Sequence, residues 1–431
     1  MATHGTMTTL ADLQEIVGRD FACDAVEGDA IEGVRPRFVA TPGAVAEVSA
    51  LMRLAHGAGM TVAPRGNGTK TGWGNRPRTV DLVLRMERLN HVREHAAGDL
   101  VARAEAGVTL EALQATVRGA GQRLALNPPG PQATLGGIVA ADPSGFLRLR
   151  YGTVRDLLIG VTVVLADGTV AKAGGKVVKN VAGYDLCKLF TGSLGTLGLI
   201  VETIWRLHPL PAARRTVAVV LDTPDAIGAA VGDLLHAPLT PLALDALELR
   251  WSSSGGSFTL AALCEGIAPG VVAQAATVER LLAAYGTART LDPDAQDLWW
   301  REAGAYPWHE GDTGLKVTHL PAALSAVLNA IAELARAGAM AARVAGPAGT
   351  GVTYVGLSGG EAESVPALIA ALRARVARAE GSVVVPQAPA TIKEKVDVWG
   401  TVGDALPLMR RVKERFDPEG ILNPGRFVGG I

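Results

Sequence analysis

Glycines, a threonine and a lysine lie close together in residues 64–74, PRGNGTKTGWG, directly after a predicted strand. Gly66 and Gly68 allow positive φ and a close approach of backbone N–H groups to an anion, while Thr69 and Lys70 add a hydroxyl and a positive charge. This combination is typical of a phosphate-binding loop, although a polar turn without a ligand is the alternative. The spacing matches neither G-x-x-x-x-G-K-[ST] nor G-x-G-x-x-G at a helix start, so P-loop and Rossmann-type sites are not supported.

A second candidate segment is residues 127–152, NPPGPQATLGGIVAADPSGFLRLRYG. Thr134 begins a short predicted helix with Gly136 and Gly137 in its first turn, so we expect unpaired N–H groups and the positive end of the helix dipole to face a diphosphate. A long glycine loop without a ligand is the alternative. Hydroxyls and exposed backbone for a polyol chain and a ring would come from Ser144, Gly145, Tyr151 and Gly152.

A third segment is residues 177–201, VVKNVAGYDLCKLFTGSLGTLGLIV, in which Gly192, Gly195 and Gly198 precede a β-rich run. Backbone rather than side chains would lie against a ligand there. From residue 130 to residue 198, glycine is 13 of 69 residues, which is too dense for ordinary helices and strands. Three such segments in this order favour one shared ligand site.

Hydrophobic periodicity predicts the elements that position these segments. Residues 37–66 predict a compact β-α-β unit, and residues 100–129 predict a second one, with a helix from Thr109 that ends near Gly121. From Leu158 a period-two pattern, split by Asp167-Gly168, predicts a hairpin in a mixed sheet.

Two prolines, Pro209 and Pro211, mark the best domain boundary, because the glycine density falls after them. Beyond them, strand and helix signals alternate in a βαβ-βαβ-like order, which predicts an α+β domain. A closing helix, ALPLMRRVKERFD, then leads into PEGILNPGRF.

Composition limits the classes of function. A chain of 431 residues, 48% of them hydrophobic, is expected to form two or three domains, and a formal net charge of −1 argues against a nucleic-acid partner. The sequence has no signal-peptide pattern and no apolar run long enough for an integral membrane segment, so cytoplasmic residence is the default expectation. Cys23, Cys187 and Cys264 are widely spaced and indicate neither a disulfide framework nor a zinc or iron–sulfur site.

The order of PRGNGTK, PPGPQATLGGIVAADPSGFLRLRYG and GYDLCKLFTGSLGTLGLIVETIWRL closely resembles the FAD-binding domain of the vanillyl-alcohol oxidase/p-cresol methylhydroxylase family. The resemblance implies an α+β fold, in which a two-subdomain p-cresol-methylhydroxylase-type FAD-binding domain precedes a ferredoxin-like α+β substrate or cap domain. The expected division is an N-terminal segment at 1–29, the FAD-binding domain at 30–210, the cap domain at 211–395, and a C-terminal helix and tail at 396–431 that return to the flavin.

The resemblance also implies roles for individual residues. The FAD diphosphate would be bound by Arg65, Gly66, Asn67, Gly68 and Thr69. The rest of the cofactor would be surrounded by Gly130, Pro131, Thr134, Leu135, Gly136, Gly137, Ser144, Gly145, Tyr151 and Gly152. Gly195 and Ile200 would lie near the adenine through their backbones, and Asn423 and Arg426 would reach the flavin from the C-terminal part.

Two departures from the family pattern concern chemistry. Members with a covalently attached flavin carry a His in the first glycine-rich loop, and here no His lies between His56 and His91, which implies non-covalent FAD. The 2-hydroxy-acid dehydrogenases of the family carry a His-rich segment for metal binding and proton abstraction, and no His follows His319 in this chain. No catalytic base is therefore assigned, although removing a proton from a 2-hydroxy acid requires one.

Candidates for substrate and metal binding come from the second half of the chain. Arg301 or Lys316 could bind a substrate carboxylate, and surface positions are the alternative for both. The string WHEGDTGLKVTH, residues 308–319, holds two His and two acidic residues, but a solvated loop before a strand is the preferred interpretation, so no metal is predicted.

The C-terminal RVKERFDPEGILNPGRF resembles family members that oxidise 2-hydroxy acids, and the chain length resembles most the FAD-binding subunits of bacterial glycolate oxidases. Those subunits act beside a second FAD subunit and an iron–sulfur subunit. The resemblance implies an FAD-dependent oxidoreductase that converts a small 2-hydroxy acid to a 2-oxo acid by hydride transfer to flavin, in the cytoplasm or bound to the inner membrane through partners. Alternatives are a self-sufficient oxidase or dehydrogenase, and a non-catalytic FAD-binding scaffold or electron-relay subunit that docks a second flavoprotein.

Overall fold

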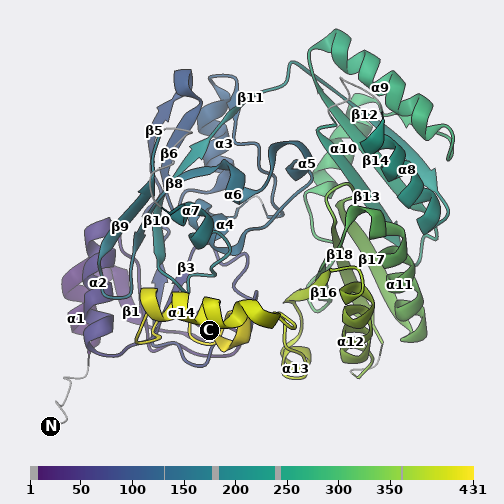
Figure 1. The fold of residues 1–431 in the computed structure, drawn as a ribbon. Helices are drawn as coiled ribbons and strands as arrows, with labels where there is room; N and C mark the ends of the chain where they lie inside the picture. The colour runs from purple at the N-terminus through teal and green to yellow at the C-terminus, as the bar shows by residue number, and fades with distance from the viewer. Residues whose placement is uncertain (1–7, 131, 177–183, 238–243, 361–362) are drawn as a thin grey trace.

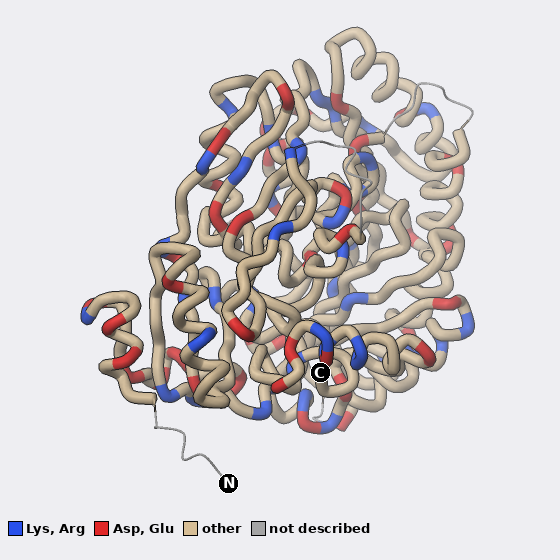
Figure 2. Tube along the Cα trace, turned by 60° about the vertical axis from the view of Figure 1, so that its left-hand side comes forward, with Lys and Arg blue, Asp and Glu red and all other residues tan. Residues whose placement is uncertain are grey.

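The computed structural model describes residues 8–130, 132–176, 184–237, 244–360 and 363–431. Two bodies lie side by side, and the chain passes from the first to the second between β11 (His208–Pro209) and β12 (Ala213–Leu221) (Figure 1). Lys and Arg are interspersed with Asp and Glu along the described trace (Figure 2). None of its helices is long and apolar enough to cross a membrane.

A four-stranded sheet and its helices form the N-terminal part of the first body. Its elements are α1 (Leu10–Val17), β1 (Ala22–Asp24), β2 (Phe38–Ala40), α2 (Val45–Gly57), β3 (Val62–Arg65) and β4 (Leu82–Arg85). The first predicted β-α-β unit is confirmed, because α2 connects β2 to β3 and both strands pair in parallel with β4 between them. Val48, Leu51, Met52 and Ala55 are buried at helical spacing and hold α2 on the sheet.

A five-stranded sheet and short helices form the rest of the first body. Its elements are β5 (Val92–Ala96), β6 (Val101–Glu105), α3 (Leu110–Arg118), α4 (Leu135–Ala141), α5 (Arg148–Tyr151), α6 (Val154–Leu157), β8 (Leu158–Val164), β9 (Val170–Gly174), α7 (Leu186–Phe190) and β10 (Leu199–Arg206). The hairpin of β8 and β9 turns at Asp167-Gly168 as predicted, with Gly168 at φ 82°. The expected mixed sheet around it is wrong, because the order β5-β6-β10-β8-β9 is antiparallel throughout.

The second predicted β-α-β unit is also wrong. The strand β6 and the helix α3 form, but β7 (Gln122–Arg123) pairs antiparallel with β11 in a separate two-stranded sheet. After β7, the side chain of Gln114 on α3 binds both backbone groups of Leu124, at 2.6 Å to the carbonyl and 3.1 Å to the amide. The Gln114 side chain therefore makes the backbone hydrogen bonds to Leu124 that a neighbouring strand would otherwise make.

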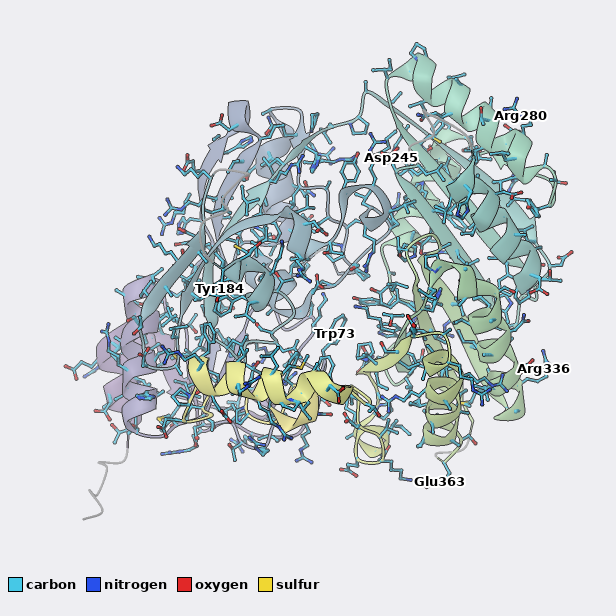
Figure 3. The ribbon with its side chains drawn as sticks, in the orientation of Figure 1. Trp73, Tyr184, Asp245, Arg280, Arg336 and Glu363 are labelled. Carbon is cyan, nitrogen blue, oxygen red and sulfur yellow. The ribbon has the colours of Figure 1, made fainter. Side chains whose placement is uncertain are left out.

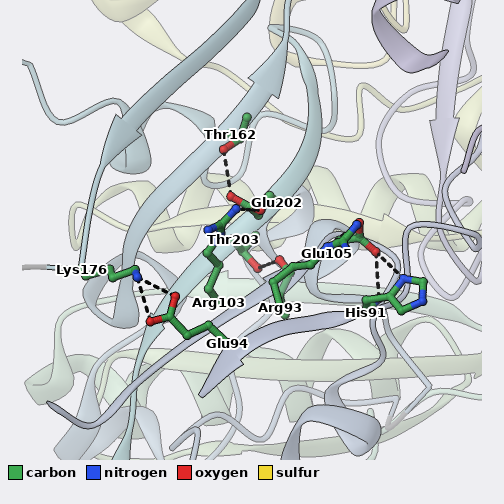
Figure 4. A network of polar contacts seen from close by, with 10 residues as sticks. His91, Arg93, Glu94, Arg103, Glu105, Thr162, Lys176, Glu202 and Thr203 are labelled. Carbon is green, nitrogen blue, oxygen red and sulfur yellow. Dashed lines mark hydrogen bonds and ion pairs between the residues drawn. The ribbon is translucent and has the colours of Figure 1, made fainter. Parts of the chain in front are cut away.

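Ion pairs hold the register of the five-stranded sheet. Glu105 on β6 and Glu202 on β10 stand directly opposite each other, and like charges in that position repel. Arg103 binds Glu202 at 2.8 Å, while Arg93 binds one oxygen of Glu105 and His91 binds the other (Figure 4). The two arginines therefore offset the repulsion between the glutamates.

The second body is built on one antiparallel eight-stranded sheet in the order β15-β12-β14-β13-β17-β18-β16-β19. Its further strands are β13 (Ala246–Ser252), β14 (Phe258–Gly266), β15 (Arg289–Thr290), β16 (Thr313–Thr318), β17 (Met340–Pro347), β18 (Val352–Gly359) and β19 (Ser382–Gln387). Its helices are α8 (Pro224–His236), α9 (Ala268–Leu282), α10 (Pro293–Ala303), α11 (Leu324–Ala337) and α12 (Ser364–Ala377).

This sheet consists of two ferredoxin-like units joined edge to edge. Each unit has the element order βαββαβ, the first from β12 to β15 and the second from β16 to β19, and β13 pairs with β17 where they meet. The ferredoxin-like prediction is thus confirmed, but the doubling was not foreseen. Helices α8, α9, α11 and α12 cover one face, and the other face packs against α10 and turns toward the first body (Figure 1).

The last segment of the chain returns to the first body. Helix α14 (Leu406–Phe416) runs beneath the first body, and the chain after it forms a parallel bridge to β3 (Figure 1). The amide of Val62 donates to the carbonyl of Ile421 at 2.8 Å, and the amide of Asn423 donates to the carbonyl of Val62 at 2.9 Å. Strand β3 and the segment around Leu422, which are far apart in the sequence, therefore lie side by side at one edge of the N-terminal sheet.

Candidate functional site

A cavity of about 860 Å³, its open mouth included, lies in the first body where the three glycine-rich segments and the tail meet. Twelve residues of the predicted FAD site line it: Arg65, Gly66, Asn67, Gly68, Thr69, Thr134, Gly136, Gly137, Gly195, Ile200, Asn423 and Arg426. Lys70, which the first segment already indicated as its positive charge, also lines it, as do Thr71 and Leu194, which were not among the predicted site residues.

The loop after β3 presents free backbone donors to this cavity. No described residue accepts a hydrogen bond from the backbone amides of residues 66–70. Gly68 has φ 74°, and a Cβ on Gly66 would lie 2.2 Å from Thr134 Oγ1, so only glycine lets this loop approach α4 so closely. Consecutive free amides in such a loop suit an anion.

The start of α4 corrects the expectation of unpaired amides. The amides of Leu135 and Gly136 donate to the carbonyls of Val108 and Ala106, both at 2.8 Å, and the amide of Gly137 donates to Thr134 Oγ1 at 3.3 Å. The start of the helix is therefore tied to the end of β6. Of the two sets of backbone amides that were expected to bind an anion, only those of residues 66–70 lack a hydrogen-bond acceptor among the described residues.

The two glycines of α4 serve different purposes. A Cβ on Gly136 would lie 2.7 Å from the Cβ of Ala106, so this glycine is required by packing on the sheet. A Cβ on Gly137 would meet only Thr134 Oγ1, at 3.1 Å, and Gly137 lines the cavity. A side chain at position 137 would therefore project into the ligand space.

Two tail residues close the cavity on the side of β3. Arg426 is buried and donates to the carbonyls of Thr71, at 2.7 Å, and Trp73, and burial lowers its pKa to about 10. Asn423, at φ 44°, donates through Nδ2 to the carbonyl of Leu194 at 2.7 Å. The tail thus connects the first loop to the third glycine-rich segment.

Several other predicted site residues do not reach the cavity. Leu135 is part of the core, and Gly145 and Gly152 lie against Asn127 and Asp156. Gly130, at φ 94°, lies near the Lys70 ammonium, and Pro131 lies outside the described residues.

Tyr151 and Ser144 instead contact the second body. The Tyr151 hydroxyl accepts from Arg123 at 2.9 Å and lies 3.3 Å from Asp245 on the loop before β13 (Figure 3). Arg123 also binds Glu265 through both carboxylate oxygens. The carbonyl of Ser144 accepts from the hydroxyl of Tyr354 at 3.1 Å.

The two proposed substrate cations differ in their surroundings. Arg301 is exposed on α10 and does not line the cavity. Lys316 lies on β16, on the face toward the first body, and burial lowers its pKa.

Aromatic side chains fill the space beside Lys316. Tyr306 stacks on Trp308 at 4.3 Å between ring centroids, and it contacts Trp73 at 5.9 Å. Trp73 follows the first loop and lies between the two bodies (Figure 3). The segment that begins at the cavity wall with residues 65–71 therefore continues to a ring contact with the second body at Trp73.

Comparison with known proteins agrees with this geometry. Residues 36–174 match the family described as FAD binding domain, and residues 210–427 match the family described as FAD linked oxidases, C-terminal domain. This chain belongs to the FAD-linked oxidases. FAD is accordingly the cofactor of this chain.

Relatives of this FAD-linked oxidase include several enzymes of 2-hydroxy acids by name. Glycolate oxidase subunit GlcD of Bacillus subtilis is 34% identical over 49% of this chain and 46% of its own length. D-lactate dehydrogenase of Archaeoglobus fulgidus is 28% identical over 90% of this chain and 91% of its own. D-2-hydroxyglutarate dehydrogenase of Xanthomonas citri is 27% identical over 91% of this chain and 89% of its own length.

Solved structures show the same fold. The 4-ethylphenol oxidase of Gulosibacter chungangensis superposes with a TM-score of 0.76 at 16% identity, covering 97% of this chain and 96% of that one. p-Cresol methylhydroxylase superposes with a TM-score of 0.75 at 17% identity, covering 97% of this chain and 95% of that one. The p-cresol-methylhydroxylase-type fold is thereby confirmed.

The cavity fits FAD on its own geometry. The amides of residues 66–70 are free, these residues line the cavity, and Lys70 lies at its wall. Negative diphosphate oxygens match these free amides and the positive charge. A side chain on Gly66 would clash with Thr134, so the glycine keeps the loop close to α4. We expect these residues of the first loop to hold the diphosphate.

A pH-dependent FAD affinity is the first expected result. Burial lowers the pKa of Lys70 to about 8, so the ammonium in the cofactor-free protein loses its proton as the pH rises through that value. A hydrogen bond to a charged group contributes about 1.5–3 kcal/mol, so FAD should bind about 10- to 100-fold more weakly at a pH well above 8. Titrating the cofactor-free protein with FAD at several pH values measures this, and Lys70→Met should bind weakly with a flatter pH profile.

Stability without FAD should move in the opposite direction. A lysine whose pKa is lowered from 10.5 to about 8 by burial destabilises the fold at lower pH, and that cost decreases between about pH 8 and 10.5 and is gone above 10.5. Unfolding of cofactor-free wild type and Lys70→Met should therefore converge at high pH. An FAD affinity that falls equally in both proteins would contradict the role given to Lys70.

Proposed function

We propose that this chain oxidises a small 2-hydroxy acid to a 2-oxo acid, as the FAD-binding subunit of a glycolate-oxidase-like complex. Bound FAD supplies the hydride acceptor. Supporting this proposal, relatives named for D-lactate and D-2-hydroxyglutarate align with about nine-tenths of the chain. The name of the Bacillus relative also describes a subunit.

The single structural observation that carries the proposal is the half-buried Lys316 at the boundary between the bodies. Its ammonium has no hydrogen-bond acceptor among the described residues, and it lies on the same sheet face as Tyr354, which contacts the first body. A partly desolvated cation without an acceptor is stabilised when a ligand anion arrives, and the carboxylate of a 2-hydroxy acid is such an anion. A substrate bound there would face the flavin end of the cofactor.

The orientation of FAD follows from the position of its diphosphate. With the diphosphate at residues 66–70 and the adenine near Gly195 and Ile200, the isoalloxazine ring should point along Ala140 and Ala141 toward the second body. We propose that the cofactor is held without a covalent bond, since no His, Cys or Tyr is among the described residues that line the cavity.

Anaerobic mixing with 2-hydroxy acids tests the proposed function. The FAD-loaded chain should lose its oxidised flavin absorbance with at least one of glycolate, D-lactate and D-2-hydroxyglutarate, because hydride transfer reduces the flavin without a further acceptor. Lys316→Met should raise the substrate concentration that is needed by tenfold or more, while Arg301→Met, on exposed α10, should act as wild type. A flavin that dithionite reduces but that none of the three acids reduces would favour an FAD-binding scaffold or electron-relay subunit instead.

A further inference from the structure

Asp142 stands at the junction between the FAD cavity and the domain boundary. It is the C-cap residue of α4, in the left-handed conformation with φ 45°, and the two residues before it line the cavity. Its Oδ1 atom is shielded from solvent and has no hydrogen-bond partner in the described part of the chain. A carboxylate oxygen in that state is costly unless a ligand supplies a donor.

Lys316 faces Asp142 from the second body. On the sheet, Lys316 is the direct cross-strand neighbour of Tyr354, so the two side chains lie on the same face. The Tyr354 hydroxyl donates to the carbonyl of Ser144, which is two residues after Asp142, at 3.1 Å. This contact brings β16 and β18 against the end of α4.

The charges around this junction are mixed. Burial raises the pKa of Asp142, and the positive charges of Lys316, Arg148 and Arg155 oppose that rise while Asp156 adds to it. Burial likewise lowers the pKa of Lys316, which Asp142 opposes. A carboxylate and an ammonium therefore influence each other, and among the described residues they do not form a direct ion pair.

Other titratable groups nearby are already engaged. His319, the last histidine, has both ring nitrogens in hydrogen bonds, to the Leu320 carbonyl at 2.8 Å and to Thr353 Oγ1 at 3.0 Å. Burial raises the pKa of Tyr354 well above neutrality, and its hydroxyl proton is used on Ser144. Compared with His319 and Tyr354, Asp142 is the residue whose side chain still has a free hydrogen-bond acceptor, its Oδ1 atom.

We propose that Asp142 is the proton acceptor for a 2-hydroxy acid whose carboxylate is bound by Lys316. This inference rests on the proposed function and adds the missing base. The O–H bond of the substrate breaks and its proton passes to the Asp142 carboxylate, while the Cα–H bond breaks and its electron pair leaves with the hydrogen to the flavin. The two electrons of the hydroxyl O–H bond form the new C=O bond, so the acid is oxidised to a 2-oxo acid and FAD is reduced by two electrons.

Asp142→Asn separates proton transfer from binding. Asparagine tolerates the left-handed conformation, so the FAD-loaded variant should melt close to wild type. The rate of flavin reduction by the best of glycolate, D-lactate and D-2-hydroxyglutarate should fall about 100-fold or more, the usual range for losing a general base. Oxalate, which has no proton to transfer, should bind at least as tightly as in wild type, measured by the change in flavin absorbance. Asp142→Gly, which also suits this conformation, serves as a second variant.

Two further variants complete the test. Lys316→Met should weaken oxalate binding tenfold or more, and Glu310→Gln, an exposed carboxylate change, should leave both rate and binding unaltered. Reduction of Asp142→Asn at the wild-type rate would overturn the inference and leave the proposed function standing, as would a rate loss matched by lost oxalate binding. Wild-type flavin that none of the three acids reduces would overturn the proposed function, and this inference with it.

Discussion

Gly137→Val should yield a folded protein that no longer binds FAD. The added side chain meets only Thr134 Oγ1 within the protein and otherwise occupies the cavity. A ligand at about 100 times its Kd stabilises a fold by roughly 2.7 kcal/mol, so the variant should lose the melting shift that added FAD gives to wild type. Thermal unfolding of both proteins, with and without FAD, measures the effect.

Gly136→Val is the matched control for this variant. Its Cβ would lie within 2.7 Å of Ala106, so the cofactor-free variant itself should melt lower than wild type. The two neighbouring substitutions thus separate ligand exclusion from misfolding. A full FAD shift in Gly137→Val would place the cofactor elsewhere than the cavity described here.

Asp417→Ala should lower the free energy of unfolding by about 3–5 kcal/mol, because it leaves the buried ammonium of Lys413 without its counterion. Asp417 is fully buried and binds Lys413 Nζ at 2.6 Å. It also accepts the backbone amides of Ile421, at 3.1 Å, and Leu422, at 2.8 Å. Chemical denaturation measures the loss, and FAD affinity should fall as well because Asn423 and Arg426 follow directly.

A double variant and a surface variant test the cause. Lys413→Met with Asp417→Ala removes the uncompensated charge and should recover part of the stability. Glu333→Ala breaks the pair with Arg375, in which both side chains are largely exposed, and should cost at most about 1 kcal/mol. An Asp417→Ala protein as stable as the surface variant would show that the tail is held by other contacts.

Local patterns predicted the second body well, because most of its helices and strands carry their own periodicity. The helix that begins at Thr223-Pro224 and the two strands around residues 342–357 formed as expected. The doubling of the ferredoxin-like unit was not visible, since it depends on β13 pairing with β17 and not on repeated residues. Pairing between distant strands leaves little trace in a single sequence.

The same limit explains the errors in the first body. The residues after β7 were expected to form a strand, but Gln114, a polar residue on the preceding helix, binds the backbone of Leu124. The glycine-rich segments did predict where the cavity lies, because bare backbone is needed there whatever the tertiary contacts. Which amides remain free could not be predicted, since it depends on carbonyls just after β6 that accept from Leu135 and Gly136.

Asp142 was missed for a similar reason. In AADPSG it reads as an ordinary turn residue before a proline, and its importance comes from Lys316, which is far away in the sequence. The one local signal is its position at the end of a helix that begins in a ligand-binding segment. A site at a domain boundary combines residues from both bodies, whereas a single sequence segment contains the residues of only one body.

The parallel bridge between Val62 and Leu422 has a consequence for biosynthesis. On the ribosome, β3 emerges long before its partner, and the whole eight-stranded sheet is translated in between. The cofactor cavity therefore keeps an open wall during elongation and acquires Asn423 and Arg426 only with the last stretch of the chain. Such late closure between distant segments is slow and leaves apolar edges exposed to chaperones. We therefore expect FAD to be loaded after translation, and a nascent chain stalled within the second body to lack this part of the cavity wall.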